Sequence, residues 1–380
     1  MNTINNNVNY IDYIPFPDKN IKAIVDINAI KYNINFLRYK AKTDLMPILK
    51  SNAYGHGLIK ISRILRELGI KYIGVATLGE AILLRKSGDN GRILSWIYNV
   101  EGDDLKDGIK LDLDIAIFDD KLIPKIKKLI PNGKKIKITM FIDTGINRAG
   151  IPYKKALQAF KDVINCDKFE LVGMMSQLVC SEIKNSPIVN EQLHKFRTLR
   201  KKLEIMGINI PLVHIANTGA CLNYDVSDFT LARTGCGIFG IFNNKINRNL
   251  KLTMTVKTNI IQLKDVDKGE GIGYNWKYIT PKKMRIAILP IGYGDFIPEI
   301  CSGKLYIYIN GTKRKVLGTI NMDQIIVEAK KKDRINNNAI IFGNGINCKQ
   351  TIFDISKIGK CFPLEILCHI GYRVKLIYKK

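Results

Sequence analysis

Paired cysteines, closely spaced histidines and long hydrophobic runs are all missing from this chain of 380 residues. None of its four histidines stands at zinc-ligand spacing from another histidine or from a cysteine, so no metal site is expected. Its eight cysteines show no paired spacing, which is typical of free thiols in a reducing compartment. No apolar run reaches the roughly 20 residues that span a bilayer, and the first residues lack the basic-then-apolar pattern of a signal peptide. These absences predict a cytoplasmic protein without a membrane segment.

Acidic side chains are also scarce. Asp and Glu number 34 against 60 Lys and Arg, which leaves a net charge of +26. A basic surface attracts polyanions, so nucleic-acid binding through charge alone is an alternative, testable by its steep salt dependence. The lysines, however, are spread along the whole chain among many Asn and Ile residues, as A/T-rich codon usage produces, and no nucleic-acid-binding motif accompanies them. We therefore expect no nucleic-acid partner.

Short apolar runs alternate with helical patterns over the first two thirds of the chain. Examples of the helical patterns are residues 58–68, 154–164 and 189–206. Eight strands separated by helices predict an α/β fold, a parallel (β/α)8 barrel whose strand ends all meet at one mouth. The expected strands are Leu45–Lys50, Tyr72–Ala76, Arg92–Trp96, Asp114–Ile117, Ile136–Ile142, Glu170–Met174, Leu212–Ala216 and Phe229–Arg233.

From about residue 250 the apolar residues alternate with a period of two. The segments that begin at Met254 and Leu305 both alternate, and the second contains Asn310-Gly311, a strong signal for a two-residue hairpin turn. The pattern predicts a mostly antiparallel β domain after the barrel. We expect the barrel to cover residues 20–250 and the β domain residues 251–380, with residues 1–19 joined to the latter.

The segment Met46-Pro-Ile-Leu-Lys-Ser-Asn-Ala-Tyr-Gly-His-Gly57 brings a single lysine, Lys50, to the end of a predicted strand. A glycine-punctuated turn and a helix follow at once. A lysine that its neighbours desolvate has a lowered pKa and acts as a nucleophilic amine or a general base. The alternative is a solvated lysine that merely ends a strand, which is the commoner situation.

The seventh and eighth expected strands lead into Asn217-Thr-Gly-Ala and Arg233-Thr-Gly-Cys-Gly. In barrels of this type the loops after these strands often hold a phosphate through backbone N–H groups. Thr218 could add a hydroxyl group, and Gly235 lets the backbone approach closely. An ordinary helix cap and a glycine turn would explain each segment alone. Together with Lys50 they predict an aldehyde cofactor that carries a phosphate, and pyridoxal 5'-phosphate fits this description.

Over essentially its full length the chain resembles the alanine racemases, which are pyridoxal-phosphate enzymes. The most specific match is Lys50-Ser-Asn-Ala-Tyr-Gly-His-Gly, which is similar to the cofactor-lysine motif of the family. The chain also matches, in order, the segments that start at Asp143 (Asp-Thr-Gly-Ile-Asn-Arg-Ala-Gly), Gly269 (Gly-Glu-Gly-Ile-Gly-Tyr), Gly292 (Gly-Tyr-Gly-Asp), Gly318 (Gly-Thr-Ile-Asn-Met-Asp-Gln) and Glu365 (Glu-Ile-Leu-Cys-His-Ile-Gly-Tyr-Arg).

The resemblance implies a role for each matching residue. Lys50 would bind the cofactor and exchange the α-proton on one face of the substrate, and Tyr274 of the partner subunit would serve the other face. Racemisation needs two bases, because one base would usually return the proton to its original side. Arg233 would bond the pyridine nitrogen, and Arg148 and the Met322 backbone would bind the substrate carboxylate. The positions implied for phosphate binding are Tyr54, Thr218, Gly235, Cys236 and Tyr372. Taken alone, Tyr274 could be an interface aromatic residue and Arg233 could pair with an acidic neighbour.

Three positions depart from the family pattern. Phe141 stands where many relatives have a carbamylated lysine that orients the arginine, so we expect chloride or a nearby carboxylate to orient Arg148 instead. Gln177 stands where the family has a histidine, which keeps hydrogen bonding but loses charge and proton transfer. Phe296 replaces a glycine.

The resemblance implies a homodimeric racemase that shares its active sites between subunits, acts on L- and D-alanine, and supplies D-alanine for peptidoglycan. Three alternatives stay open. They are a serine or broad-specificity racemase, a decarboxylase of the same two-domain type, and a weakened protein that only binds the cofactor.

Overall fold

The computed structural model describes residues 20–343, 345 and 347–380. The chain divides into two compact units. One is formed by Ile27–Thr253, and the other combines the described residues up to Asp26 with Met254–Lys380.

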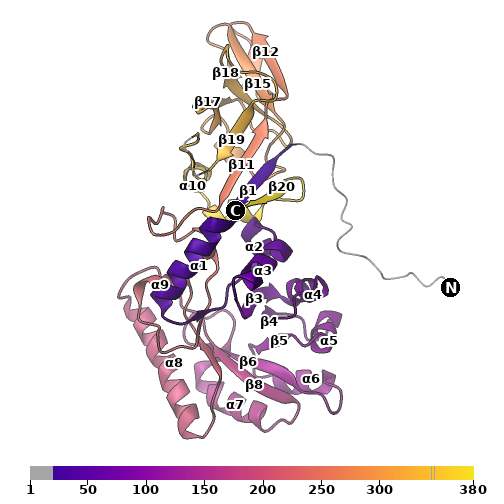
Figure 1. Ribbon diagram of the computed structural model, residues 1–380, viewed down its shortest axis with the longest axis vertical. Coiled ribbons are helices and arrows are strands. Elements are labelled where there is room, and N and C mark those ends of the chain that lie inside the picture. Colours follow the sequence, from indigo (N-terminus) through magenta and orange to yellow (C-terminus); the bar gives the residue numbers. More distant parts are fainter. Residues whose placement is uncertain (1–19, 344, 346) are drawn as a thin grey trace, which may run out of the picture. The chain divides into compact units, whose positions relative to one another are not determined.

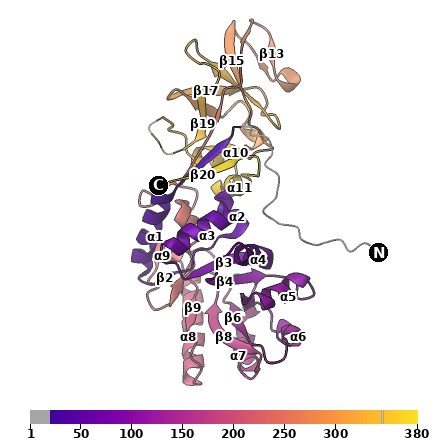
Figure 2. The same cartoon turned by 45° about the vertical axis from the view of Figure 1, so that its right-hand side comes forward.

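The unit Ile27–Thr253 is built on eight parallel strands (Figure 1; Figure 2). Six of them pair side by side in the order β3, β4, β5, β6, β8, β9, and β10 pairs with β2. Single bridges from Ile48 to Gly74 and from Asn217 to Arg233 join these two groups at both edges, so the ring of strands closes. This confirms the expected barrel. The strands are β2 (Asp44–Leu45), β3 (Tyr72–Thr77), β4 (Arg92–Ile97), β5 (Asp114–Ile117), β6 (Ile136–Asp143), β8 (Phe169–Met175), β9 (Leu212–His214) and β10 (Leu231–Ala232), and the short β7 (Ile151–Pro152) pairs with β6.

Helices follow the strands and cover the outside of the ring (Figure 2). Their sequences explain their orientation, since α3 buries Ile61, Ile64 and Leu65 at helical spacing, and Thr77 with Glu80 forms a capping box that starts α4. The helices are α1 (Ile27–Ala41), α2 (Lys50–Gly55), α3 (Leu58–Glu67), α4 (Leu78–Lys86), α5 (Asp103–Lys110), α6 (Leu122–Leu129), α7 (Ala156–Ile164), α8 (Pro187–Ile205) and α9 (Thr218–Asn223), with 3-10 turns η1 (Tyr153–Lys155) and η2 (Cys236–Phe239).

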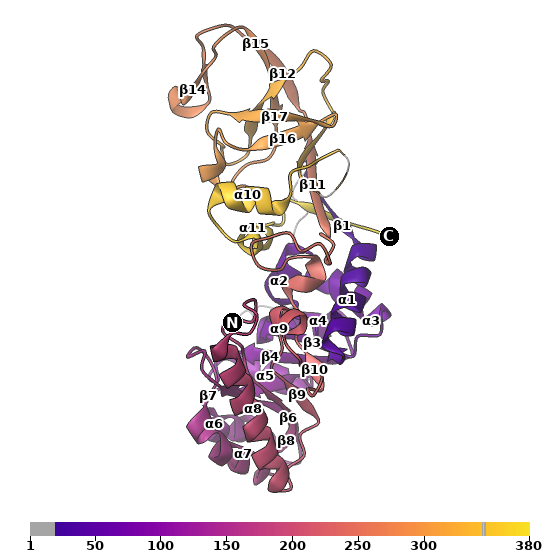
Figure 3. The same cartoon turned by 90° about the vertical axis from the view of Figure 1, so that its left-hand side faces the viewer.

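The other unit is built on a nine-stranded, mostly antiparallel sheet in the order β12, β15, β18, β17, β16, β19, β11, β1, β20 (Figure 3). The Asn310-Gly311 hairpin is confirmed, because both residues have positive φ and Ile309 pairs with Thr312. The strands are β1 (Lys22–Asp26), β11 (Met254–Asn259), β12 (Gln262–Val266), β15 (Met284–Leu289), β16 (Tyr306–Ile309), β17 (Thr312–Leu317), β18 (Ile325–Ala329), β19 (Asn338–Phe342) and β20 (Lys375–Lys379). A separate pair joins β13 (Gly271–Ile272) to β14 (Tyr278–Ile279), and the helical segments are η3 (Tyr274–Trp276), η4 (Glu299–Cys301), α10 (Ile352–Gly359) and α11 (Pro363–Cys368).

The boundary at the start of the barrel differs from the expectation that residues 20–26 belong to it. Strand β1 pairs antiparallel with β11 and parallel with β20, so it belongs to the β domain. Its alternate residues Ala23 and Val25 are fully buried, and a period of two is the pattern of a strand with one covered face. The barrel unit therefore begins at Ile27. The expected position of residues 1–19 lies outside the described part of the chain.

Within the described residues, no helix is long and apolar enough to cross a membrane. The same part of the chain contains no group of three or more His, Cys, Asp or Glu side chains arranged to hold a metal ion. All eight cysteines fall in it and all are free thiols.

Candidate active site

Lys50 lies at the mouth of the barrel, but not at the end of a strand as expected. Strand β2 stops at Leu45, and Lys50 begins a helical turn in which Ser51 to Tyr54 all have positive φ. A left-handed conformation costs roughly 1–2 kcal/mol for each non-glycine residue, and strain of this kind is typical of functional sites. The side chain of Lys50 is exposed, which corrects the expectation of a lysine desolvated by its neighbours.

His56 holds the end of this turn. Its Nδ1 atom lies 2.9 Å from the carbonyl oxygen of Tyr54, its Nε2 atom lies 2.9 Å from the Thr253 hydroxyl, and its ring stacks on Phe239. Burial lowers the pKa of His56 to about 4. The histidine is therefore neutral at pH 7 and donates from Nδ1 to the Tyr54 carbonyl.

Four predicted cofactor residues gather beside Lys50. The Lys50 amine lies 5.9 Å from the centre of the Tyr54 ring. Burial raises the pKa of the Cys236 thiol, and the positive charge of the nearby Lys50 opposes this increase. A Cβ atom on Gly235 would lie only 2.4 Å from the Tyr54 hydroxyl, so glycine is needed for this close approach. Thr218 is buried beside Cys236, yet no hydrogen bond of acceptable geometry from the described residues satisfies its Oγ1 atom.

Arg233 is buried and its terminal nitrogen atoms are held from two sides. Nη1 donates to the His214 carbonyl oxygen at 2.6 Å and to His214 Nδ1 at 2.9 Å. Nη2 donates to the Ser176 carbonyl oxygen and to Gln177 Oε1, the latter at 3.3 Å. Burial lowers the pKa of Arg233 to about 10, so the guanidinium stays charged at pH 7. Among the described residues no carboxylate pairs with it, which rules out the alternative of an ion pair at the rim.

His214, which the sequence patterns do not single out, is the main partner of Arg233. Burial, and then the charge of Arg233, lower its pKa well below the usual value. The ring is therefore neutral, with Nδ1 as acceptor for Arg233, and its Nε2 atom is buried without a hydrogen-bond partner in the described structure. The available signal was its position on the seventh barrel strand, three residues before Asn217, where side chains can reach the mouth of the barrel.

Arg148 lies in the loop after β6, is exposed, and forms no hydrogen bond or ion pair with the described residues. The expected orienting carboxylate is therefore not present in this structure. Phe141 belongs to the cluster of apolar side chains inside the barrel that includes Met175 and Leu231, packed against Trp96. This lining is apolar, so the aromatic ring fills space that a charged group could occupy only at a desolvation cost.

Two of the remaining predicted residues meet on the β domain. Tyr274 and Met322 line a pocket of about 580 Å³ together with Tyr293, Glu299, Thr319, Ile320, Asn321, Asp323 and Gln324. Tyr274 is 70% exposed. Tyr372 is also exposed but does not line this pocket.

Backbone contacts shape the loop that carries Met322. The N–H of Tyr293 donates to Asn321 O and the N–H of Gly294 donates to Met322 O, both at 3.0 Å. A Cβ atom on Gly292 would lie 2.0 Å from Asn321 O, so a side chain there would separate the two loops. Arg373 forms ion pairs with Asp295, at 2.9 Å, and with Asp323, at 2.6 Å. Asp323 directly follows Met322, so these ion pairs also support the loop.

Comparison with known proteins decides the family. The profile for the alanine racemase N-terminal domain matches residues 25–243, and the profile for its C-terminal domain matches residues 253–378. The chain belongs to the alanine racemase family. It is 32% identical over 366 residues to the alanine racemase of Borreliella burgdorferi, covering 94% of this chain and 97% of that protein. It is 30% identical over 363 residues to alanine racemase 2 of Caldanaerobacter subterraneus, covering 93% of each.

Solved structures agree with this assignment. The alanine racemase of Streptomyces coelicolor superposes with a TM-score of 0.88 at 27% identity, covering 95% of this chain and 98% of that chain. The alanine racemase of a D-cycloserine-producing Streptomyces lavendulae gives a TM-score of 0.87 at 28% identity, covering 96% and 98%.

The barrel residues fit the pyridoxal phosphate that alanine racemases use. The buried, unsatisfied Thr218 hydroxyl and the glycine backbone at Gly235 suit phosphate oxygen atoms. The exposed Lys50 amine offers a nucleophile for the aldehyde, and the charged Arg233 offers a donor for the ring nitrogen. The residues present therefore match the chemistry of the cofactor.

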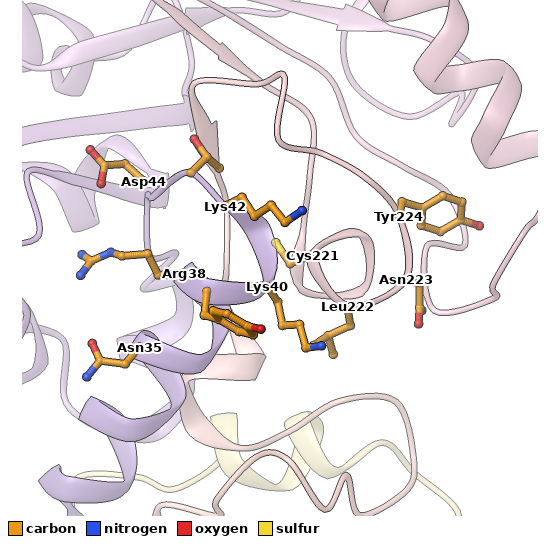
Figure 4. A pocket seen from close by; sticks show the side chains of 11 residues that line it. Asn35, Arg38, Lys40, Lys42, Asp44, Cys221, Leu222, Asn223 and Tyr224 are labelled. Atoms are coloured by element: carbon orange, nitrogen blue, oxygen red, sulfur yellow. The ribbon is translucent and has the colours of Figure 1, made fainter.

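Another pocket, in the barrel unit, carries positive charge but none of the predicted residues. It measures about 870 Å³ and is lined by Asn35, Arg38, Tyr39, Lys40, Lys42, Thr43, Asp44 and residues 221–224 (Figure 4). Lys40 and Lys42 point toward the end of α9, as Figure 4 shows. Arg38 and Lys40 stand in the last turn of α1, where cations offset the helix dipole. This charge therefore has a structural explanation.

Proposed function

We propose that this chain interconverts L-alanine and D-alanine with pyridoxal phosphate as cofactor, and so supplies D-alanine for peptidoglycan in the cytoplasm. The observation that carries the proposal is the grouping of Lys50, Tyr54, Gly235 and Cys236 beside the unsatisfied hydroxyl of Thr218. This grouping supplies an amine and a phosphate cradle at one end of a barrel. The family match over both domains supports the choice of alanine.

Once bound, pyridoxal phosphate supplies an electron sink that stabilises the negative charge left at Cα when the proton is removed. Lys50 would hold the cofactor through its amine and then take or return the α-proton on one face. Tyr274 would hold or give a proton at its phenol oxygen on the other face. Two groups on opposite faces are what racemisation requires.

Arg233 would donate to the ring nitrogen of the cofactor and would not give up its proton, since its pKa stays near 10. His214 and the Ser176 carbonyl hold the two terminal nitrogen atoms of the guanidinium, so its direction is set before the cofactor binds. Arg148 and the Met322 backbone would bind the substrate carboxylate. Tyr372 would complete the phosphate contacts of Tyr54, Thr218, Gly235 and Cys236.

We also propose a homodimer in which each site uses barrel residues of one subunit and Tyr274 of the other. Tyr274 and Trp276 are 70% and 67% exposed on one short turn of the β domain. Exposed aromatic residues are enriched at protein interfaces.

The test is to purify the chain, measure the visible absorbance of bound cofactor, and follow D-alanine formation from L-alanine with a stereospecific oxidase. We expect a yellow protein that brings either isomer to an equal mixture. Parallel assays with serine and other amino acids measure specificity, and carbon dioxide release tests for decarboxylation. A colourless protein that gains no activity on addition of pyridoxal phosphate would overturn the proposal.

A further inference from the structure

Gln192 stands out in helix α8 because it is a polar residue in a buried stripe. The other buried residues of the helix are Val189, Leu193, Phe196, Leu199 and Leu203. Gln192 lies on the same face and is only 1% exposed. A buried amide is costly unless its donors and acceptor are bonded, so its partners show what it holds.

The Gln192 side chain binds the backbone on both sides of Leu178. Its Nε2 donates to the carbonyl oxygen of Gln177 at 3.0 Å, and its Oε1 accepts from the N–H of Val179 at 3.0 Å. One amide thus replaces the backbone partner that a neighbouring strand would supply. The segment 176–179 follows β8 and lies outside the described strands, although the Ser176 N–H still donates to the His214 carbonyl oxygen of β9 at 3.3 Å. The Gln192 amide fixes the part of the segment beyond Ser176.

The segment that Gln192 fixes supplies two of the acceptors of Arg233. The guanidinium donates to Ser176 O and to Gln177 Oε1 from the same nitrogen atom, Nη2. A shift of this segment would therefore turn the guanidinium. Hydrogen bonds to a charged group depend strongly on this alignment.

Gln192 also reaches the loop that carries Arg148. Its Nε2 lies 3.4 Å from the Thr144 hydroxyl, which in turn bonds the Ser176 hydroxyl at 2.8 Å. Asp143 shapes the same loop by accepting from the N–H groups of Gly145 and Ile146. One side chain thus connects the segment that supplies acceptors to Arg233 with the loop that carries Arg148.

We infer that Gln192 is a positioning residue that aligns Arg233 through Ser176 and Gln177, and the Arg148 loop through Thr144. This inference rests on the proposed function, because it concerns how the same site is held. It makes Gln192 part of the cofactor-binding apparatus without any contact to the cofactor.

The test compares two changes in the same buried stripe. Gln192→Met has nearly the same length but makes none of the three contacts, and Leu199→Ala removes packing away from the loops. We expect Gln192→Met to raise the dissociation constant of pyridoxal phosphate for the apoprotein about tenfold, as loss of one well-aligned bond to a charged group does, and to shift the visible absorbance band. Leu199→Ala should change this dissociation constant by no more than about twofold, even if its melting temperature falls as far as that of Gln192→Met.

A second variant, Gln192→Glu, keeps the acceptor for Val179 but loses both donors at neutral pH. Protonation of the buried carboxyl restores one donor, so its cofactor affinity, relative to wild type at the same pH, should improve as the pH falls. The inference is overturned if Gln192→Met binds the cofactor with unchanged affinity and absorbance, or if affinity follows melting temperature equally in Gln192→Met and Leu199→Ala. If the wild-type protein binds no cofactor, the proposed function itself fails.

Discussion

His56 links the acid stability of the chain to the turn that carries Lys50. Its folded pKa of about 4 lies below the unfolded value of 6.5 because burial opposes its charge. The unfolded chain therefore binds more protons between these values, and stability is complete above pH 6.5 and falls as the pH drops toward 4. The free energy of unfolding falls by about 3 kcal/mol at most through this group.

We predict that His56→Gln, which cannot be protonated, weakens this dependence. The free energy of unfolding from urea titrations at pH 7 and pH 5 should fall less in the variant than in wild type. Part of this dependence of the free energy of unfolding on pH should remain in the variant, since the buried His214 also has a lowered pKa. Equal losses in the two proteins would show that His56 does not titrate on unfolding.

Substitutions of Phe141 test directly which group, if any, orients Arg148. Its ring lies among apolar side chains inside the barrel, so Phe141→Lys should destabilise the fold by roughly 2 kcal/mol or more and leave turnover unchanged or lower. Phe141→Leu, which keeps the apolar lining, is the control. Activity should rise with chloride to a plateau if that ion orients Arg148. A chloride-independent enzyme whose turnover Phe141→Lys clearly raises would mean that Arg148 is simply not oriented.

Much of the regular structure of both units could be predicted from the sequence, but the Lys50 turn could not. Strands β3 to β6 and the Asn310-Gly311 hairpin follow from apolar runs and turn residues. The four successive positive φ values from Ser51 to Tyr54 carry no such signal, because serine, asparagine, alanine and tyrosine all prefer other conformations. Contacts from distant segments, such as the hydrogen bond from the Ser51 N–H to Glu80 at 2.6 Å, support this turn and are invisible in a local pattern.

The strain in this turn predicts that two substitutions of Ser51 differ in their effect on stability. Ser51→Gly should be neutral or slightly stabilising, because glycine adopts positive φ freely. Ser51→Val should destabilise the chain by about 1–2 kcal/mol, since a β-branched residue is disfavoured there, and should also weaken cofactor binding. Urea unfolding of both variants measures the difference. Equal stabilities would mean that the turn is not left-handed in solution.

The segments Lys22–Asp26 and Met254–Asn259, more than 200 residues apart, pair in one sheet. Sequence patterns could predict each strand's period but not this partner, so the domain boundary was misplaced by a few residues. Likewise the roles of His214 and Gln192 depend on which distant loops they meet, and only the folded chain brings these together.

The proposed sharing of sites between subunits predicts complementation. Tyr274→Phe should lower racemisation by roughly 10²- to 10⁴-fold while retaining the cofactor, because it removes a single proton-transferring group. Lys50→Ala should be inactive. Mixed after subunit exchange, the two variants should regain part of the wild-type activity, since one of the two sites in each mixed dimer has both groups intact. Mixtures that exchange subunits and stay inactive would argue for a site within one chain.

Lys50 is the residue on which the account depends, and its link to the cofactor can be measured directly. The holoprotein is reduced with borohydride, digested, and its peptides are analysed by mass spectrometry. We predict that the mass of the reduced cofactor is found on the peptide that contains Lys50, and that the Lys50→Ala variant, which should fold normally because this side chain is exposed, shows no such peptide. Cofactor fixed to another lysine in wild type, or an unchanged adduct in Lys50→Ala, would contradict the proposed active site.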